Sequence, residues 1–370
     1  MTDIYESFAL RLRGRRQELG LTQRRLAEQL GYSEKAISKW ESGAAIAPSV
    51  ILPKLATALR TDVNYLLLGA DGAKYLLGID GGGTKTDFML TDTEGNEIAR
   101  VKLDGCNPVD VGYRFMCDVL SEGITRVCGS IPCSDISVFA GIAGGTAGSN
   151  REYIHDYLKG FGFYSVKNGN DAESAVAAAL DTDNGTVVII GTGSIAFSQI
   201  DGVLYRRGGF GNLFEDGGSG YHIGRDAILT ALKDEEMGRT GRILELVREQ
   251  LGRESVLSSL SELYAGGKRR IAEFSRVVFT AYDDGDAVAE QILKGNMKAI
   301  AELIESAPIT STDGGRNRIY LMGGLISRAD VLLPMIKASL GDPDSYEIFT
   351  NTTPPVMGAI RLAARSLKEK

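Results

Sequence analysis

One arrangement of strands and glycine loops occurs twice in this sequence. An apolar run leads into the loop at 80–86, and two further strand-like segments joined by a turn follow it. The same order returns around the loop at 191–194. The strands expected on this basis cover residues 75–79, 87–90, 97–102, 186–190, 195–199 and 203–205. Because the whole unit is repeated, the sequence predicts two similar α/β lobes with a cleft between them.

The glycines in both repeats stand where the first strand ends. Glycine amides can approach a phosphate closely because no Cβ intervenes, so the loops indicate a nucleotide or sugar site made largely of backbone. They are neither a Walker A loop nor a dinucleotide-binding turn, since they connect strands to strands rather than to helices. A third glycine cluster, at 141–148 after a strand over 136–140, resembles a dinucleotide-binding turn. One isolated cluster is weak, and we do not adopt that interpretation.

Composition limits the class of protein. Apolar residues make up 43% and charged residues 24% of the 370 residues, which is typical of a globular chain. No apolar run is long enough for a membrane helix and no signal peptide is visible, so we expect a cytoplasmic protein without a membrane partner. The four cysteines and two histidines show no metal-binding spacing. We therefore expect reduced thiols and no zinc site.

Charge is distributed unevenly along the chain. Residues 1–70 contain 10 basic and 7 acidic side chains, a net charge of +3. Because the whole chain carries −7, the remaining residues carry −10. A basic N-terminal part on an acidic body indicates two functions.

Helical spacing of apolar residues predicts five short helices between residues 4 and 69. Thr22 and Ser33 are good N-caps for the second and third helices, and Gly31 supplies a turn with positive φ between them. Two short helices joined by a tight glycine turn are typical of a helix-turn-helix domain.

The run over residues 21–43, LTQRRLAEQLGYSEKAISKWESG, closely resembles the Cro/repressor-type helix-turn-helix family. The resemblance implies that the third helix enters the major groove of duplex DNA and that a homodimer binds paired half-sites of an operator. The alternative is a helical interaction module with solvated charges. The expected DNA contacts are Gln23, Ser33, Glu34, Lys35, Ser38 and Lys39, with Arg15, Arg16, Arg24 and Arg25 as candidate phosphate contacts.

The body resembles the sugar kinase/Hsp70/actin superfamily and, within it, the BadF/BadG/BcrA/BcrD ATPase family on its N-acetylglucosamine kinase side. The blocks that carry the resemblance are the two glycine loops, 106–108, 170–174, 208–211, 216–221, 323–325 and 354–359. It implies an all-α helix-turn-helix domain followed by an α/β two-lobed ribonuclease H-like (actin-like ATPase) fold. The expected parts are a head (1–69), a linker (70–74), a first lobe (75–180) to which a helix at 359–367 returns, and a second lobe (181–358).

The resemblance also implies ATP and Mg²⁺ as cofactors and an amino sugar as the phosphoryl acceptor. Asp80 is expected to hold the metal, because Mg²⁺ prefers carboxylates; the alternative is a turn aspartate at a strand end. Asp171 is the candidate general base, although a carboxylate at a helix N-terminus often only caps, and the helix amides would keep it a weak base. The expected ATP contacts are Gly81, Gly82, Gly83, Thr84, Lys85, Gly191, Thr192, Gly193, Ser194, Gly323, Gly324 and Leu325.

The expected sugar contacts are Asn107, Asp171, Thr192, Gly209, Phe210 and Asp216. For Asn107 and Asp216 the alternative is a role in stabilising loops. One departure from the family is evident, since Gly217 stands where the family usually has a glutamate after the aspartate. That loss is expected to alter sugar preference or weaken catalysis.

Three functions fit these observations. The first is an ATP-dependent amino-sugar kinase, with N-acetylglucosamine 6-phosphate as product, fused to a DNA-binding head. The second is an ATPase that activates a dehydratase or reductase and holds an iron–sulfur cluster between subunits through its cysteines. The third is a transcriptional regulator whose body senses a sugar with little or no turnover.

Overall fold

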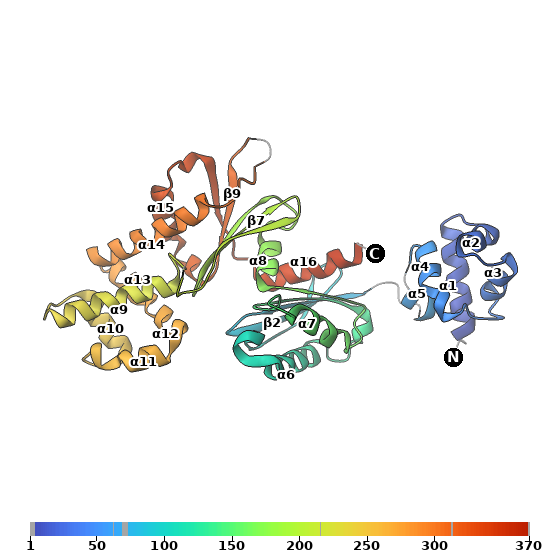
Figure 1. Ribbon diagram of the computed structural model, residues 1–370, viewed down its shortest axis with the longest axis horizontal. Coiled ribbons are helices and arrows are strands. Elements are labelled where there is room, and N and C mark those ends of the chain that lie inside the picture. Colours follow the sequence, from blue (N-terminus) through green and yellow to red (C-terminus); the bar gives the residue numbers. More distant parts are fainter. Residues whose placement is uncertain (1–3, 62, 69–72, 215, 312–313, 369–370) are drawn as a thin grey trace. The chain divides into compact units, whose positions relative to one another are not determined.

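The computed structural model describes residues 4–61, 63–68, 73–214, 216–311 and 314–368 (Figure 1). The chain divides into two compact units, Met1–Ser174 with Pro355–Lys370, and Ala175–Pro354. Residues 70–72 of the expected linker lie outside the described residues. The predicted domain boundaries therefore stay a prediction.

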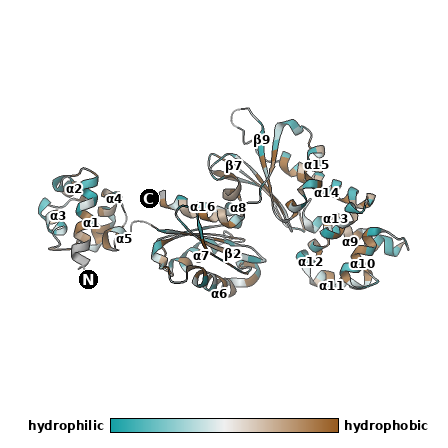
Figure 2. Cartoon of the chain, turned by 180° about the vertical axis from the view of Figure 1, so that it is seen from behind, coloured by the Kyte–Doolittle hydropathy of each residue, from teal (hydrophilic) through white to brown (hydrophobic). Residues whose placement is uncertain are grey.

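The N-terminal head is entirely helical. Thr22 Oγ1 accepts the Arg25 N–H at 3.1 Å and Ser33 Oγ accepts the Ala36 N–H at 3.3 Å, so both predicted N-caps are confirmed. Gly31 has φ of 71°, as the tight turn requires. The helices are α1 (Ile4–Glu18), α2 (Gln23–Leu30), α3 (Glu34–Glu41), α4 (Leu52–Ala58) and α5 (Val63–Leu68), with a 3-10 turn, η1 (Ser49–Ile51). In Figure 2, α2 and α3 are largely hydrophilic in colour, whereas their apolar residues are buried.

The first unit of the body is built on a five-stranded sheet of order β3-β2-β1-β4-β5. Its strands are β1 (Tyr75–Gly81), β2 (Lys85–Asp92), β3 (Glu97–Asp104), β4 (Ile136–Ile142) and β5 (Ser165–Gly169). The pairs β1–β2 and β2–β3 are antiparallel, whereas β4 and β5 run parallel to β1. The helices are α6 (Pro108–Cys128), α7 (Asn150–Lys159) and α16 (Pro355–Lys368), with the 3-10 turn η2 (Cys133–Asp135). The helix α8 (Asp171–Leu180) begins in this unit and continues into the second after Ser174.

Helices cover both faces of this sheet. α6 and α7 lie on one face and α16 on the other (Figure 1). The alternation of side chains along β1 matches this arrangement, since Leu77 and Ile79 pack with α6 while Leu76 packs with α16. α16 approaches β1 so closely that a Cβ on Gly78 would lie 2.6 Å from the Val356 carbonyl oxygen. The C-terminal helix thus closes the first unit's core.

The second unit repeats the same sheet. Its order is β10-β9-β6-β7-β8, which matches β5-β4-β1-β2-β3 strand for strand, so the predicted duplication is confirmed. The strands are β6 (Gly185–Ile190), β7 (Ser194–Ile200), β8 (Val203–Gly208), β9 (Asn317–Met322) and β10 (Tyr346–Thr350). The helices are α9 (Gly220–Glu236), α10 (Arg242–Leu251), α11 (Leu260–Ala265), α12 (Gly267–Glu273), α13 (Ser275–Asp283), α14 (Ala287–Glu305) and α15 (Ala329–Ser339), with 3-10 turns η3 (Leu257–Ser259), η4 (Gly324–Arg328) and η5 (Pro343–Ser345).

The described part of the chain contains no helix that is long and apolar enough to span a bilayer.

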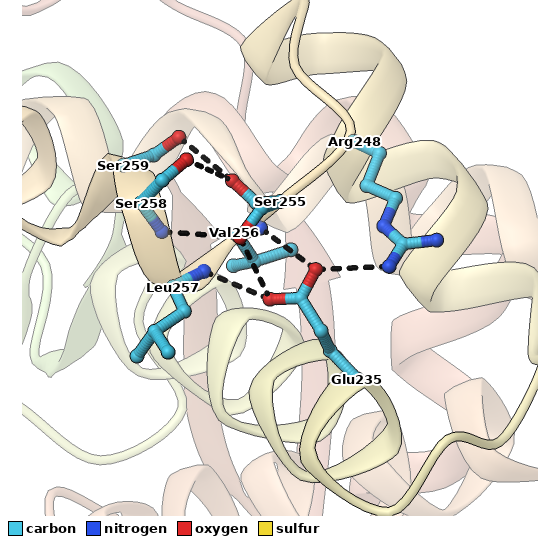
Figure 3. Close-up of polar contacts among 7 residues, drawn as sticks. All are labelled: Glu235, Arg248, Ser255, Val256, Leu257, Ser258 and Ser259. Atoms are coloured by element: carbon cyan, nitrogen blue, oxygen red, sulfur yellow. Dashed lines mark hydrogen bonds and ion pairs between the residues drawn. The ribbon is translucent and has the colours of Figure 1, made fainter.

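One carboxylate joins three elements of the second unit. Near the end of α9, Glu235 accepts hydrogen bonds from the N–H groups of Val256 and Leu257 at 3.1 and 2.9 Å and from the Arg248 guanidinium at 2.9 Å (Figure 3). Burial by itself raises the pKa of Glu235, but the guanidinium and the two N–H groups outweigh it and lower the pKa below its ordinary value. The carboxylate therefore stabilises the start of η3 and α11 more strongly when it is charged.

Replacing Glu235 by Gln keeps the side-chain shape and removes the charge. We expect the free energy of unfolding at neutral pH to fall by about 1–3 kcal/mol, the scale of hydrogen bonds to charged groups. Because the folded pKa lies below the ordinary value of 4.5, this difference is present above that pH and is lost as the pH falls through the folded pKa. Urea unfolding of both proteins across this pH range measures it.

The control for this experiment is Glu122→Gln. Glu122 pairs with Arg126 at 2.9 Å on the exposed side of α6, and such surface pairs contribute little to stability. The role given to Glu235 would be contradicted if both variants lost the same unfolding free energy. It would also be contradicted if the loss in Glu235→Gln persisted in acid.

Candidate active site and DNA-binding head

The two aspartates expected to carry the chemistry lie at one edge of the first sheet. In the parallel register Asp80 is opposite Gly141, and Gly141 is opposite Gly169 at the end of β5. Asp171 follows two residues later, as the first residue of α8. Burial, and then the neighbouring Asp171 carboxylate, raise the pKa of Asp80 to about 7, while the Lys85 ammonium opposes the rise. The fold therefore brings both carboxylates and Lys85 together.

The N-cap of α8 is Asn170 rather than Asp171. Asn170 Oδ1 accepts the Glu173 N–H at 2.9 Å, and Glu173 Oε1 accepts the Asn170 N–H at 3.2 Å. This reciprocal pair is a capping box and satisfies the helix end without Asp171. The capping alternative for Asp171 is therefore removed.

The local environment of Asp171 also differs from expectation. Its Oδ1 accepts a hydrogen bond from the Ala172 N–H at 3.1 Å. Burial raises the pKa of Asp171, and this outweighs the lowering by the backbone N–H groups of Ala172 and Asp171 itself. The backbone N–H groups at the start of α8 thus lower the pKa of Asp171 as expected, but burial has the larger effect.

The first glycine loop is a tight hairpin between β1 and β2. The Gly82 N–H donates to the Lys85 carbonyl at 2.9 Å, and the Cys106 N–H donates to the Gly82 carbonyl at 3.1 Å. Gly83 packs so closely on Gly105 that a Cβ on Gly105 would lie 2.4 Å from the Gly83 carbonyl carbon. The exposed residues Gly83, Thr84 and Lys85 form the tip of this loop.

The second glycine loop rests on the start of α9. The Gly220 N–H donates to the Gly191 carbonyl at 2.8 Å, and the Tyr221 N–H donates to the Thr192 carbonyl at 3.2 Å. Gly193 faces Asp216, whose carboxylate oxygen would lie 3.0 Å from a Cβ at that position. α9 thus fixes the loop backbone.

Asp216 is buried against this loop. Its side chain accepts the N–H groups of Ser194 and Gly211, and burial, the largest influence, raises its pKa. Asn107 is likewise engaged, since it caps α6 by accepting the Val109 N–H at 3.0 Å and donates to Asp110 at 2.7 Å. These contacts fit the loop-stabilising alternative for both residues, and their roles toward a sugar stay predictions.

A pocket of about 720 Å³ in the second unit unites two of the predicted ATP elements. Gly191 and Thr192 of the second loop line it together with Gly324 and Leu325. Gly323 has φ of 105°, and a Cβ there would lie 2.4 Å from the Ile190 carbonyl oxygen, so only glycine allows η4 to start against β6. The remaining lining residues are Gly220, Arg269, Ala272, Glu273, Ser275, Arg276, Phe279, Thr280, Ser327 and Arg328.

Sequence reasoning missed the helical wall of this pocket, which comes mainly from α12 and α13. These residues follow no glycine motif and read in the sequence as ordinary amphipathic helix. Only the position of α13 beside the second loop gives them a lining role.

Gly209 and Phe210 stand on an exposed loop of the second unit. Gly209 has φ of 70°, and Phe210 is 66% exposed with the Arg206 guanidinium 5.5 Å from its ring centroid. The described residues Leu213 and Phe214 beside it are also exposed. The proposed apolar wall at Phe210 stays a prediction.

The head presents most of the predicted DNA contacts to solvent. Ser33, Glu34, Lys35, Ser38 and Lys39 are exposed at the start and along one side of α3. Gln23 is half-buried, and its Nε2 donates to Glu41 Oε2 at 2.8 Å. Gln23 is therefore held inside the head in this structure.

Two of the candidate phosphate contacts are engaged within the head. The expectation for Arg16 is wrong, because this buried side chain donates to both carboxylate oxygens of Glu41 and to the Leu21 carbonyl. Arg15 donates to the carbonyl oxygens of Leu59 and Arg60 at the end of α4. Both arginines stabilise the packing of α1, whereas Arg24 and Arg25 are exposed.

Comparison with known proteins decides the family. The sequence profile of the BadF/BadG/BcrA/BcrD ATPase family matches residues 77–363. The chain belongs to this family. A second profile, that of a helix-turn-helix domain, matches residues 7–66. The predicted family of the body and the predicted helix-turn-helix head are both confirmed.

Relatives of known name cover the body almost completely. The chain is 32% identical over 287 residues to the N-acetylmuramic acid/N-acetylglucosamine kinase of Clostridium acetobutylicum, covering 71% of this chain and 93% of the relative. It is 29% identical over 319 residues to the N-acetyl-D-glucosamine kinase of Dictyostelium discoideum, covering 79% of this chain and 98% of that relative. A crystal structure from Chromobacterium violaceum, provisionally assigned as an N-acetylglucosamine kinase, matches with a TM-score of 0.64 at 19% identity over 79% of this chain and 99% of that one. The last match concerns the fold alone and confirms the predicted fold class.

The structure gives a physical context for the departure at Gly217. A Cβ built on Gly217 would lie 2.8 Å from the Cβ of Ala299 on α14, closer than real side chains approach. A side chain at position 217 would therefore overlap the Ala299 side chain. The residue that fits at 217 depends on the residue at 299.

Restoring the missing glutamate tests this match. We expect Gly217→Glu to lower the free energy of unfolding by about 1–3 kcal/mol through overpacking. Ala299→Gly alone should cost about 1 kcal/mol of helix stability. The double variant should lose less unfolding free energy than the two single variants lose together, because the second change removes the clash. Strictly additive losses in urea unfolding would show that the two positions do not constrain each other.

Proposed function

We propose that this protein is an ATP-dependent amino-sugar kinase that phosphorylates the 6-hydroxyl of N-acetylglucosamine and carries a DNA-binding head. The observation that carries the proposal is the pair of half-buried carboxylates at the edge of the first sheet, one of which, Asp171, is not the N-cap of α8. The named relatives are kinases of N-acetylated amino sugars, which supports this substrate class. In this proposal the first unit binds the sugar and the second unit binds the nucleotide.

Asp171 acts as the general base. Its carboxylate accepts the proton of the sugar hydroxyl as the oxygen attacks the γ-phosphorus of ATP, and ADP leaves. A buried carboxylate of raised pKa accepts a proton more readily than an exposed one. Burial also keeps water from competing with the sugar for the phosphoryl group.

Asp80 is suited to hold Mg²⁺. Burial and the neighbouring Asp171 and Asp87 carboxylates raise its pKa, and the Lys85 ammonium opposes the rise. Among the described residues no group of three or more His, Cys, Asp or Glu side chains gathers as a metal cage. A site with the Asp80 carboxylate as donor fits Mg²⁺, because this ion is held by one or two carboxylates together with water and substrate phosphates. When bound, the ion would neutralise charge on the phosphates.

The backbone supplies the nucleotide contacts. The exposed tip of the first loop (Gly83, Thr84 and Lys85) and the second loop above α9 offer amides to phosphate oxygens. The pocket that joins Thr192 to Leu325 is of a size typical for small-molecule sites. It is the proposed position of adenosine.

The activator alternative fits less well. Of the four cysteines, Cys106 and Cys128 are buried, whereas a cluster shared between subunits needs exposed thiolates. Burial also raises the pKa of the Cys128 thiol to about 12, which disfavours the thiolate that binds iron.

The head supports a second role as a DNA-binding module. We propose that α3 enters the major groove and that two copies of the chain bind paired half-sites. Lys35 and Lys39 are exposed on α3, where their ammonium groups can reach the phosphates or base edges of a duplex. Sugar-dependent regulation of an operator would follow from joining this head to the kinase body.

The kinase proposal is tested first by ADP release from ATP and Mg²⁺. The sugar panel comprises glucosamine, N-acetylglucosamine, N-acetylmannosamine, N-acetylmuramic acid and glucose. We expect the highest kcat/KM with N-acetylglucosamine. No sugar-dependent ADP release with any of them would leave the body as a sensor without turnover.

Asp171→Asn tests the general base. We expect kcat to fall by about 100-fold or more, the usual range for a positioned base, with a smaller change in sugar affinity. The control is Asp286→Asn, since Asp286 caps α14 by accepting the Ala289 N–H at 2.8 Å and Asn caps equally well. A turnover of Asp171→Asn close to that of the control would remove Asp171 from the mechanism.

Lys39→Ala tests the DNA-binding head. If Lys39 contacts phosphate, affinity should weaken similarly for all duplexes. The slope of log affinity against log salt concentration should then fall by about one. If it reads a base, discrimination should fall by about 1–3 kcal/mol at one position. Lys54→Ala, at an exposed site on α4, is the control. Absence of any duplex binding at low salt would refute the DNA-binding role.

A further inference from the structure

A loop over 143–149 joins β4 to α7 and packs against the start of α6. The Ala143 N–H donates to the Gly81 carbonyl at 2.7 Å, which ties the loop to β1. A Cβ on Gly145 would lie 3.1 Å from the Gly169 carbonyl oxygen at the end of β5. The loop therefore lies between Asp80 and Asp171 on the one hand and Asn107 on the other.

The Gly144 backbone packs directly on Asn107. Gly144 has φ of 68°, and a Cβ there would lie 2.4 Å from Asn107 Oδ1. Only glycine combines this backbone conformation with so close an approach. The position of the Asn107 amide, a predicted sugar contact, thus depends on where Gly144 is held.

Two side chains outside the predicted site hold Gly144. Asn150, the first residue of α7, donates from Nδ2 to the Gly144 carbonyl at 2.8 Å. Tyr113 on α6 donates from its hydroxyl to Asn150 Oδ1 at 2.6 Å. Asn150 is 8% exposed, so its hydrogen bonds are largely protected from competition by water. The result is a chain of contacts from Tyr113 through Asn150 and Gly144 to Asn107.

The shape of α6 explains why Asn107 needs this second attachment. Gly112 has φ of 76° and ψ of 163°, a non-helical conformation that separates the turn capped by Asn107 from the rest of the helix. The helix therefore does not by itself hold the turn in place. Tyr113 follows the break directly, and its ring lies 4.2 Å from that of Tyr153, centroid to centroid, which keeps the hydroxyl aimed at Asn150.

We propose that Tyr113 and Asn150 are positioning residues for the sugar acceptor. They act through Gly144 and Asn107 and do not touch the sugar themselves. The inference rests on the proposed function, because it assigns their effect to sugar affinity. Loss of the Tyr113 hydroxyl should free the 143–149 loop and weaken sugar binding, while the nucleotide pocket of the second unit is untouched.

The experiment compares Tyr113→Phe with Tyr157→Phe in the full chain. Tyr157 on α7 also bridges to α6, since its hydroxyl donates to the Cys117 carbonyl at 2.9 Å, but it has no contact with the loop that the structure records. Each variant loses one hydroxyl and keeps its ring. For Tyr113→Phe we expect the Kd and KM for N-acetylglucosamine to rise about three- to tenfold, the value of one hydrogen bond, with KM for ATP unchanged. Tyr157→Phe should have wild-type values of the Kd and KM for N-acetylglucosamine and of the KM for ATP.

Amide hydrogen exchange of residues 143–149 provides a readout that needs no sugar. Exchange should be faster in Tyr113→Phe than in the wild type or in Tyr157→Phe. Asn150→Asp, which keeps the acceptor for Tyr113 but loses the donor to Gly144, should weaken sugar binding at least as much. The double variant Tyr113→Phe/Asn150→Asp should be no weaker than Asn150→Asp alone, because both changes break one chain of contacts.

The outcomes separate this inference from the proposed function. Wild-type turnover with the sugar panel decides whether the protein is a sugar kinase. If it is, equal sugar affinity in Tyr113→Phe and Tyr157→Phe, or unchanged exchange of the loop in Tyr113→Phe, overturns the positioning role. If the wild type binds none of the sugars, the positioning role fails together with the proposed function.

Discussion

Two carboxylates at one edge of a sheet, both partly withdrawn from water, are the constraint on which the first unit depends. Burial, and then the neighbouring Asp171 carboxylate, raise the pKa of Asp80, and burial raises that of Asp171. The parallel pairing of β1, β4 and β5 creates the pair, because it brings the carboxyl ends of three strands to the same edge.

Close approach of backbone to backbone is the second recurring element. Glycine at 78 lets α16 lie against β1, and glycine at 323 lets η4 start against β6. The same device places Gly144 on Asn107. In each case a Cβ would meet an atom at 2.6 Å or less, so packing requires glycine at these three positions.

The second unit uses the same sheet for a different purpose. Its strand order repeats that of the first unit, but helices α9 to α13 follow β8, and α12 and α13 build most of a pocket wall. Polar contacts such as those of Glu235 hold these helices to one another (Figure 3). A duplicated sheet thus supports a carboxylate site in one copy and a nucleotide-sized pocket in the other.

The sequence by itself determined the strands of the repeat, the two glycine loops, the caps at Thr22 and Ser33, and the family, because these depend on local residue patterns. It did not reveal β5 and β10, which are edge strands with many half-buried or exposed side chains and so lack a continuous apolar run. It also could not show that Asn170 rather than Asp171 caps α8, or that Arg16 is buried against Glu41. Those outcomes depend on tertiary structure, since burial and the choice among competing hydrogen-bond partners are settled only when remote segments pack together.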